Sequence, residues 1–182
     1  MIAKPMVKEL NKQIVEEVYS AYLYFSMSAH CSYIGLKGAA NWFFVQGQEE
    51  MTHAWRLFLY ITSQGEQVAL DAIGKPPAEF PSLLAMFEAA LKHERHITGR
   101  INLLSDLAVK GKDHASGVFL QWFVREQVEE EQNATDILAK LRLVGKDGSA
   151  LLIIDNELAA RTFVLAPDLA AGAAMAAPAA GA

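Results

Sequence analysis

Glu50 and His53 stand three residues apart in the segment Q-G-Q-E-E-M-T-H-A-W at 46–55. In a helix, residues at this spacing share one face, so a carboxylate and an imidazole would project side by side. Phe43 and Leu57 each lie seven residues from Glu50, which is the spacing of a buried helical stripe. An oxygen ligand and a nitrogen ligand that face a core together indicate a metal site.

Three other apolar stripes are also broken by a polar side chain near their middle. Counted along the chain, the first of the four stripes carries Glu17 and the third carries Glu94. The fourth carries Gln127, with Glu130 three residues later. Glu17 precedes Glu50 by 33 residues, and Glu94 precedes Gln127 by the same 33. The regular spacing indicates an internal duplication, with Glu-x-x-His in one half and Gln-x-x-Glu in the other.

Four carboxylates at one level of a core need a partner. Each would cost several kcal/mol to bury alone, and their mutual repulsion would drive protonation. No Lys or Arg falls on the stripes at this level, whereas two divalent cations would balance the four charges. A hydrogen-bonded structural role is the alternative for any one position, but it does not account for all of them. Oxygen-rich ligand sets with one imidazole suit iron or manganese better than structural zinc. The sequence therefore predicts a dinuclear metal site formed by Glu17, Glu50, His53, Glu94 and Glu130.

Glycines, Pro81 and capping residues divide the chain into four long helical segments and a short apolar one. The breaks and caps are G-L-K-G at 35–38, Gly65, Ser82, Gly111, Asp113 and Gly145. The short segment at 149–165 predicts a fifth helix. It is too apolar to stand alone on a surface, so we expect it to be buried by assembly.

The connections between these segments predict their topology. The first-to-second and third-to-fourth links are a few residues long, so each pair forms an antiparallel hairpin. The link over 66–81 could reach roughly 50 Å when extended, and a 28-residue helix is roughly 42 Å long. We therefore expect an all-α fold, a four-helix bundle with one long crossover and a short fifth helix. The predicted domain spans 1–165, followed by an Ala/Pro/Gly-rich tail over 166–182.

Composition excludes several other classes of protein. The net charge of −5 argues against a nucleic-acid partner bound through phosphates. Outside the tail, no run of 18 uncharged apolar residues could span a membrane, and the N-terminal segment lacks the apolar stretch of a signal peptide. Cys31 is the only cysteine, which fits a reducing compartment. We expect a cytoplasmic protein without a membrane partner.

These motifs together resemble a bacterial non-haem ferritin over residues 1–165. The matching elements are Glu17, Tyr24, E-E-M-T-H at 49–53, His93-Glu94 and F-L-Q-W-F-V-R-E-Q-V-E-E-E at 119–131. The resemblance implies a ferritin-like bundle with ferroxidase activity, in which Fe(II) is oxidised by O₂ or H₂O₂. It also implies that ferric oxyhydroxide is stored inside a homo-oligomeric shell of 24 subunits.

The resemblance assigns roles to the predicted ligands. The first iron would take Glu17, Glu50 and His53. The second would take Glu94, Glu130 and the bridging Glu50, with Gln127 close by. Tyr24 would lie beside the centre, where it can hydrogen-bond a ligand or supply an electron. Gln127 and Glu130 stand where related di-iron proteins carry a second Glu-x-x-His, so we expect this centre to release its metal more readily.

Glu49, Glu126 and Glu129 form a separate expectation. At 100° per residue they lie beside the core stripes, on the flank of Glu50 and Glu130. A solvated acidic surface is the alternative interpretation. Matching residues in bacterial non-haem ferritins bind a third iron, so the resemblance implies a third site here.

Three alternative functions remain at this stage. Met51 stands where bacterioferritins place a haem ligand, but the missing second Glu-x-x-His argues against haem. A di-iron oxidase or peroxidase of the same superfamily would act on an organic substrate or peroxide. A non-enzymatic bundle would fail to oxidise Fe(II).

Overall fold

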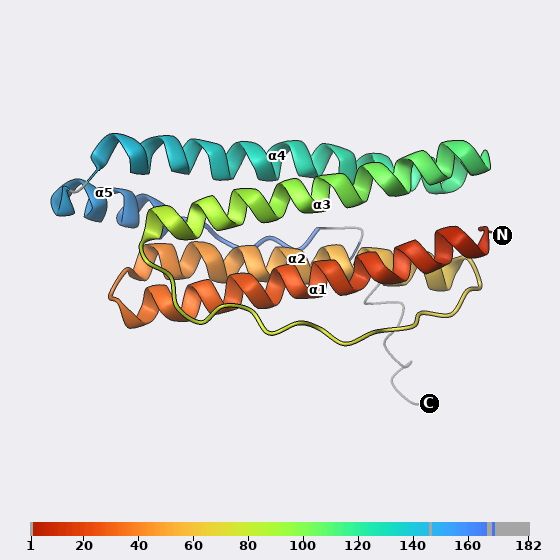
Figure 1. The fold of residues 1–182 in the computed structure, drawn as a ribbon, viewed down its shortest axis with the longest axis horizontal. Coiled ribbons are helices and arrows are strands. Elements are labelled where there is room, and N and C mark those ends of the chain that lie inside the picture. The colour runs from red at the N-terminus through yellow and green to blue at the C-terminus, as the bar shows by residue number, and fades with distance from the viewer. Residues whose placement is uncertain (1, 146, 167–168, 170–182) are drawn as a thin grey trace, which may run out of the picture.

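Every regular element of the protein is an α-helix over the residues that the structure, a computed structural model, describes: 2–145, 147–166 and 169. The predicted all-α fold is confirmed, with four long helices and a short fifth one (Figure 1). The predicted tail lies outside the described residues at 167–168 and 170–182. The helices are α1 (Lys4–Tyr33), α2 (Lys37–Ser63), α3 (Leu83–Gly111), α4 (His114–Val144) and α5 (Gly148–Leu158).

The long crossover joins the two helical hairpins. It leaves α2 at one end of the bundle and runs the whole length of α1 before α3 begins (Figure 1). Asn11 Oδ1 accepts a hydrogen bond from Ala69 N at 2.7 Å, and Ser26 Oγ donates to the Pro77 carbonyl. These contacts hold the crossover against α1 at two heights, so α2 and α3 run parallel, as the link length predicted.

The helix boundaries follow local capping chemistry. Ser82 and Asp113 accept hydrogen bonds from the backbone N–H groups of Ala85 and Ser116, so both predicted N-caps are confirmed. α3 ends at Gly111 as expected, but the left-handed residue is Lys112, with φ 52°. α4 ends at Val144, and Gly145 follows it with a φ of 55°, a positive value that glycine adopts without steric cost.

The fifth helix is shorter than the sequence predicted. It ends at Leu158, and residues 159–166 continue without helical structure. The Asn41 side chain donates hydrogen bonds to the carbonyls of Ala159 (3.3 Å) and Arg161 (2.8 Å). These bonds satisfy the carbonyl groups outside a helix, and the β-branched Thr162 and Val164 favour an extended chain.

Asp155 docks α5 onto the beginning of α2. Its carboxylate accepts hydrogen bonds from Gly38 N at 3.1 Å and Ala39 N at 2.8 Å, which are unsatisfied donors at a helix N-terminus. A Cβ on Gly38 would lie 1.6 Å from the Asp155 carbonyl oxygen, so only glycine permits this approach. α5 and the residues after it are thereby held against α2.

The core of the bundle consists of two apolar clusters with a polar layer between them. One cluster, near the α5 end, includes Tyr24, Phe43 and Phe87, and the other includes Leu57 and Phe123. The buried polar side chains are Gln13, Glu17, Ser20, Ser28, Gln46, Glu50, Thr52, His53, Glu94, Ser116, Gln127, Glu130 and Asp155. No helix within the described ranges is long and apolar enough to cross a membrane.

Candidate metal centre

The four long helices each contribute to one buried cluster of ligand-type side chains. Glu17 comes from α1, Glu50 and His53 from α2, Glu94 from α3 and Glu130 from α4, and all are at most 4% exposed. Two overlapping groups can each hold a metal ion, with their ligand atoms within 4.8 Å of one another. The first is Glu17, Glu50 and His53, and the second is Glu50, Glu94 and Glu130. Glu50 belongs to both groups, so its carboxylate is the one that the two groups share.

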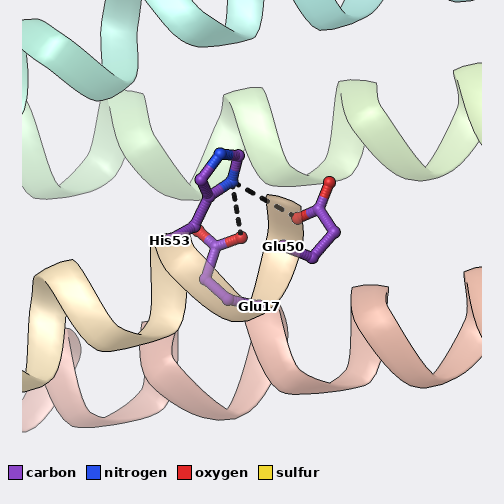
Figure 2. Close-up of side chains that lie close together, drawn as sticks. All are labelled: Glu17, Glu50 and His53. Carbon is purple, nitrogen blue, oxygen red and sulfur yellow. Dashed lines mark ion pairs between the residues drawn. The ribbon is translucent and has the colours of Figure 1, made fainter. Parts of the chain in front are cut away.

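The first group is built around the His53 ring (Figure 2). His53 Nδ1 lies 3.5 Å from Glu50 Oε2 and 3.8 Å from Glu17 Oε2. Glu17 reaches this point from the neighbouring helix α1, whereas Glu50 and His53 are one helical turn apart on α2. Two carboxylate oxygens and one imidazole nitrogen therefore converge from two helices.

The second group is positioned by neutral side chains. The Tyr24 hydroxyl donates a hydrogen bond to Glu94 Oε1. Gln46 Nε2 donates to Glu50 Oε1 at 2.9 Å and to Glu130 Oε2 at 2.8 Å, so one amide connects two of the carboxylates. Gln13 plays a similar part beside the first group, because its Nε2 donates to Glu17 Oε1 at 2.9 Å.

The cluster is electrostatically strained without a cation. Burial raises the pKa values of Glu50 and Glu130 to about 8, and neighbouring carboxylates add to the effect. Burial and the charge of Glu50 raise the pKa of Glu94 well above its usual value. Burial lowers the pKa of His53, but Glu50 and Glu17 raise it more, so that it lies well above 6.5. The site thus favours bound positive charge, either as protons or as metal ions.

Two buried carboxylate oxygens without partners support a metal site. Glu17 Oε2 and Glu94 Oε2 have no hydrogen-bond partner among the described residues. An unsatisfied buried acceptor is costly, and coordination to a cation removes the cost. One such oxygen belongs to each of the two groups, so the ligand set fits two ions.

Gln127 lies on the buried face of α4, the helix that also carries Glu130. It is 4% exposed, and its Oε1 accepts a hydrogen bond from Thr98 Oγ1 at 3.1 Å. The same hydroxyl lies 2.7 Å from Glu131 Oε1. The Gln127 side chain can offer a metal ion only a neutral amide oxygen. The second half of the site therefore differs from the first half, which contains the imidazole of His53.

The flank of the centre contains a third group, formed by His53, Glu126 and Glu130. His53 Nε2 lies 4.0 Å from Glu126 Oε1, so the two ring nitrogens of His53 face different groups. Glu49 and Glu129 line the adjoining pocket of about 450 Å³ together with Glu126. All three predicted flanking carboxylates therefore border one space.

Sequence reasoning missed three residues of this region. The sequence pattern assigned no role to Gln46 and Gln13, although each lies four residues before a predicted ligand, where a helix brings its side chain close. Arg161 forms a salt bridge with Glu49. No periodicity connects Arg161 with Glu49, because the contact depends on how the segment after α5 folds back along α2.

A four-helix bundle with a buried carboxylate cluster and one imidazole defines a helical di-metal carboxylate protein. The ferritin family model, described as a ferritin-like domain, matches residues 7–144, and the chain belongs to this family. The chain is 44% identical over 158 residues to a bacterial non-heme ferritin of Escherichia coli O6:H1, covering 87% of this chain and 96% of that protein. A bacterial non-heme ferritin of Staphylococcus epidermidis is 39% identical over 163 residues, covering 90% and 98%.

Solved structures agree with this membership. The open pore ferritin of Archaeoglobus fulgidus superimposes with a TM-score of 0.88 at 49% sequence identity, covering 89% of this chain and all of that one. An engineered closed form of the same ferritin gives a TM-score of 0.89 and also 49% identity. The fold is therefore that of ferritins, including the short fifth helix.

Proposed function

We propose that this protein is a non-haem ferritin that oxidises Fe(II) at the cluster within one subunit and stores the ferric product. The overlap of the two ligand groups at Glu50 is the observation that carries this proposal. Glu17 and His53 complete the first iron position, and Glu94 and Glu130 complete the second, with Gln127 beside it. Oxygen donors with a single nitrogen suit Fe(II) and Fe(III).

The protein's own groups account for the proton balance of the reaction. Glu50 and Glu130 carry protons at neutral pH in the metal-free protein, because their pKa values are about 8. Two Fe(II) ions displace these protons when they bind. The two ions then supply two electrons, which with two protons reduce O₂ to H₂O₂, or reduce one H₂O₂ to two water molecules. Tyr24 holds the Glu94 carboxylate in place by its hydrogen bond.

Storage requires the oxidised ions to leave the centre. The flanking carboxylates Glu49, Glu126 and Glu129 support a third iron position, since they line one pocket next to His53 and Glu130. Changing all three to Gln is expected to leave oxidation of the first two irons per chain largely intact. It should slow the recovery of the centre between successive Fe(II) additions. Equal recovery in the triple variant and the wild type would assign these carboxylates to the surface alone.

The proposed assembly is a closed shell of 24 copies. Several large apolar side chains of one subunit are exposed, among them Trp55 at 52%, Leu152 at 57% and Ile153 at 63%. Burying such side chains against further copies would stabilise a shell. The buried free thiol of Cys31 fits a cytoplasmic location.

Aerobic Fe(II) titration of the full chain tests the proposal. The wild type should oxidise two Fe(II) per chain in a fast phase and then accumulate ferric mineral, detected by light scattering. Glu50→Ala should slow the fast phase by at least about a hundredfold, because both ion positions lose a ligand. Glu88→Ala is the matched control, since Glu88 is an exposed carboxylate paired with Arg142. Wild-type kinetics in Glu50→Ala would refute the assignment.

A further inference from the structure

Arg161 places a guanidinium group on the flank of the candidate centre. Its Nη2 donates a hydrogen bond to Glu49 Oε2, and its Cζ lies 4.4 Å from the centroid of the Trp42 ring. The Arg161 carbonyl accepts a hydrogen bond from Asn41 Nδ2 at 2.8 Å. The backbone of Arg161 is thus fixed to α2, and the long side chain is the part that can move.

Among the described residues, not all of the guanidinium N–H groups of Arg161 have a hydrogen-bond partner in this position. Arg161 Nη1 is buried and has no hydrogen-bond partner within the part of the chain that the structure describes. A guanidinium offers five N–H donors, and an unmatched buried donor carries a desolvation cost. The Arg161 and Glu49 side chains are 19% and 27% exposed, so the pair is only partly shielded from solvent and ions. Its contact with Glu49 is therefore one that a stronger cation can displace.

The surrounding pocket carries an excess of negative charge. Its carboxylates are Glu49, Glu126, Glu129, Glu130, Asp136 and Glu157. Lys140 is the second cation that lines it, and its ammonium pairs with Glu157. Arg161 is accordingly the cation that neutralises the end of the pocket next to Glu49.

We propose that Arg161 is an internal counter-ion, which pairs with Glu49 while no metal ion lies on the flank. A metal ion that binds beside Glu126 then displaces the guanidinium and coordinates the Glu49 carboxylate. The inference rests on the proposed function, in which ions pass from the centre to this flank. An ion that binds Glu49 must first break the charge-assisted contact between Glu49 and Arg161, so Arg161 weakens the affinity of the third position through Glu49. The displaced guanidinium remains stacked on Trp42, which offers the ring face that Arg prefers. The third position thereby binds an ion in transit and does not retain it.

Calorimetric titration of metal-free full-length protein with Zn²⁺ tests this inference without any oxidation step. In Arg161→Gln, binding of the third Zn²⁺ per chain is expected to be about tenfold tighter than in the wild type. Arg161→Lys should give an intermediate increase of about threefold, because an ammonium lacks the planar fork and releases a carboxylate more readily. Lys140→Gln is the matched control, which removes a positive charge from the same pocket away from Glu49. It should change the third affinity by less than about twofold.

A double-mutant cycle with Glu49→Gln shows whether Arg161 acts through Glu49. In the Glu49→Gln background, Arg161→Gln should change the third affinity by less than about twofold. Equal third affinities in the wild type, Arg161→Gln and Arg161→Lys would overturn the inference, and so would a tenfold effect that persists without Glu49. If Arg161→Gln changes the native mass of the assembly, the inference is tested instead by comparing the third Zn²⁺ affinity of Arg161→Lys with that of the wild type. Failure to oxidise Fe(II) would refute the proposed function, whereas these Zn²⁺ affinities test Arg161 separately.

Discussion

The Gln46 amide of α2 lies 2.8 Å from the Glu130 carboxylate of α4, across the interior of the bundle. The same nitrogen donates to Glu50 at 2.9 Å. Gln46 Oε1 is buried without a hydrogen-bond partner among the described residues, so the orientation of the amide is set by its two donor bonds. Gln46 thus fixes one oxygen of each carboxylate and leaves the other oxygen of each for a metal ion.

Replacing Gln46 with Leu should weaken the centre while the fold is retained. The substitution removes two hydrogen bonds to ionisable groups, each of which contributes roughly 1.5–3 kcal/mol when its acceptor is charged. Zn²⁺ affinity and the fast phase of Fe(II) oxidation should both fall by about tenfold. Gln132→Leu is the control, because Gln132 makes its hydrogen bond to the exposed Asp136. Wild-type affinity and rate in Gln46→Leu would show that the amide plays no positioning role.

The stability of the metal-free protein should fall as pH rises. Glu50 and Glu130 have a pKa of about 8 in the fold, against 4.5 for an unperturbed glutamate. Between these values the unfolded chain has lost protons that the folded protein retains, so the free energy of unfolding decreases with pH. The decrease is about 1.36 kcal/mol per pH unit for each group, and it levels off above about pH 8.

Thermal unfolding of the metal-free protein between pH 5 and pH 9 measures this effect. The apparent Tm should drop by roughly 3 °C or more per pH unit. Glu50→Gln keeps a neutral side chain at every pH and should give a shallower slope. Saturating Zn²⁺ should reverse the trend, because the ions replace the protons. Parallel slopes for the wild type and Glu50→Gln would contradict the assignment of this dependence to the cluster.

The long helices and their inward-facing ligands could be predicted because both follow from local periodicity. Heptad-like stripes placed Glu17, Glu50, Glu94 and Glu130 at one level, and the length of the link at 66–81 fixed the parallel course of α2 and α3. The segment after α5 could not be predicted in this way. Its conformation depends on Asn41, Gly38 and Asp155, whose contacts span more than a hundred residues of sequence. Arg161 reaches Glu49 only because those contacts form.

Gly38→Ala should detach α5 from the bundle. The added Cβ would meet the Asp155 carbonyl at 1.6 Å, and no side-chain rotation relieves a clash with backbone. Native mass measurement is expected to show smaller assemblies, and the apparent Tm should fall. Gly99→Ala is the matched control, because a Cβ there has no atom within 4 Å and alanine favours a helix by up to about 1 kcal/mol. An intact assembly in Gly38→Ala would mean that α5 can dock in another way.

Tyr24→Phe should slow oxidation more than it weakens metal binding. The Tyr24 ring is 1% exposed, stacks on Phe43 with centroids 6.1 Å apart, and donates its hydroxyl to Glu94. Burial and the charge of Glu94 raise the pKa of Tyr24 well above its usual value, so the hydroxyl keeps its proton. Phenylalanine retains the ring packing but leaves Glu94 Oε1 without its donor and removes a phenol that could supply an electron.

The expected result for Tyr24→Phe is a fast phase about tenfold slower, with Zn²⁺ affinity within about threefold of the wild type. A bound cation itself orients Glu94, which limits the loss of affinity to that of one hydrogen bond. Stopped-flow absorbance with Fe(II) and calorimetry with Zn²⁺ give the two quantities. Tyr22→Phe is the control, since Tyr22 lies on the same helix and is 51% exposed. If rate and affinity fall by the same factor, Tyr24 acts only by positioning Glu94; if neither changes, the hydroxyl has no part in the reaction.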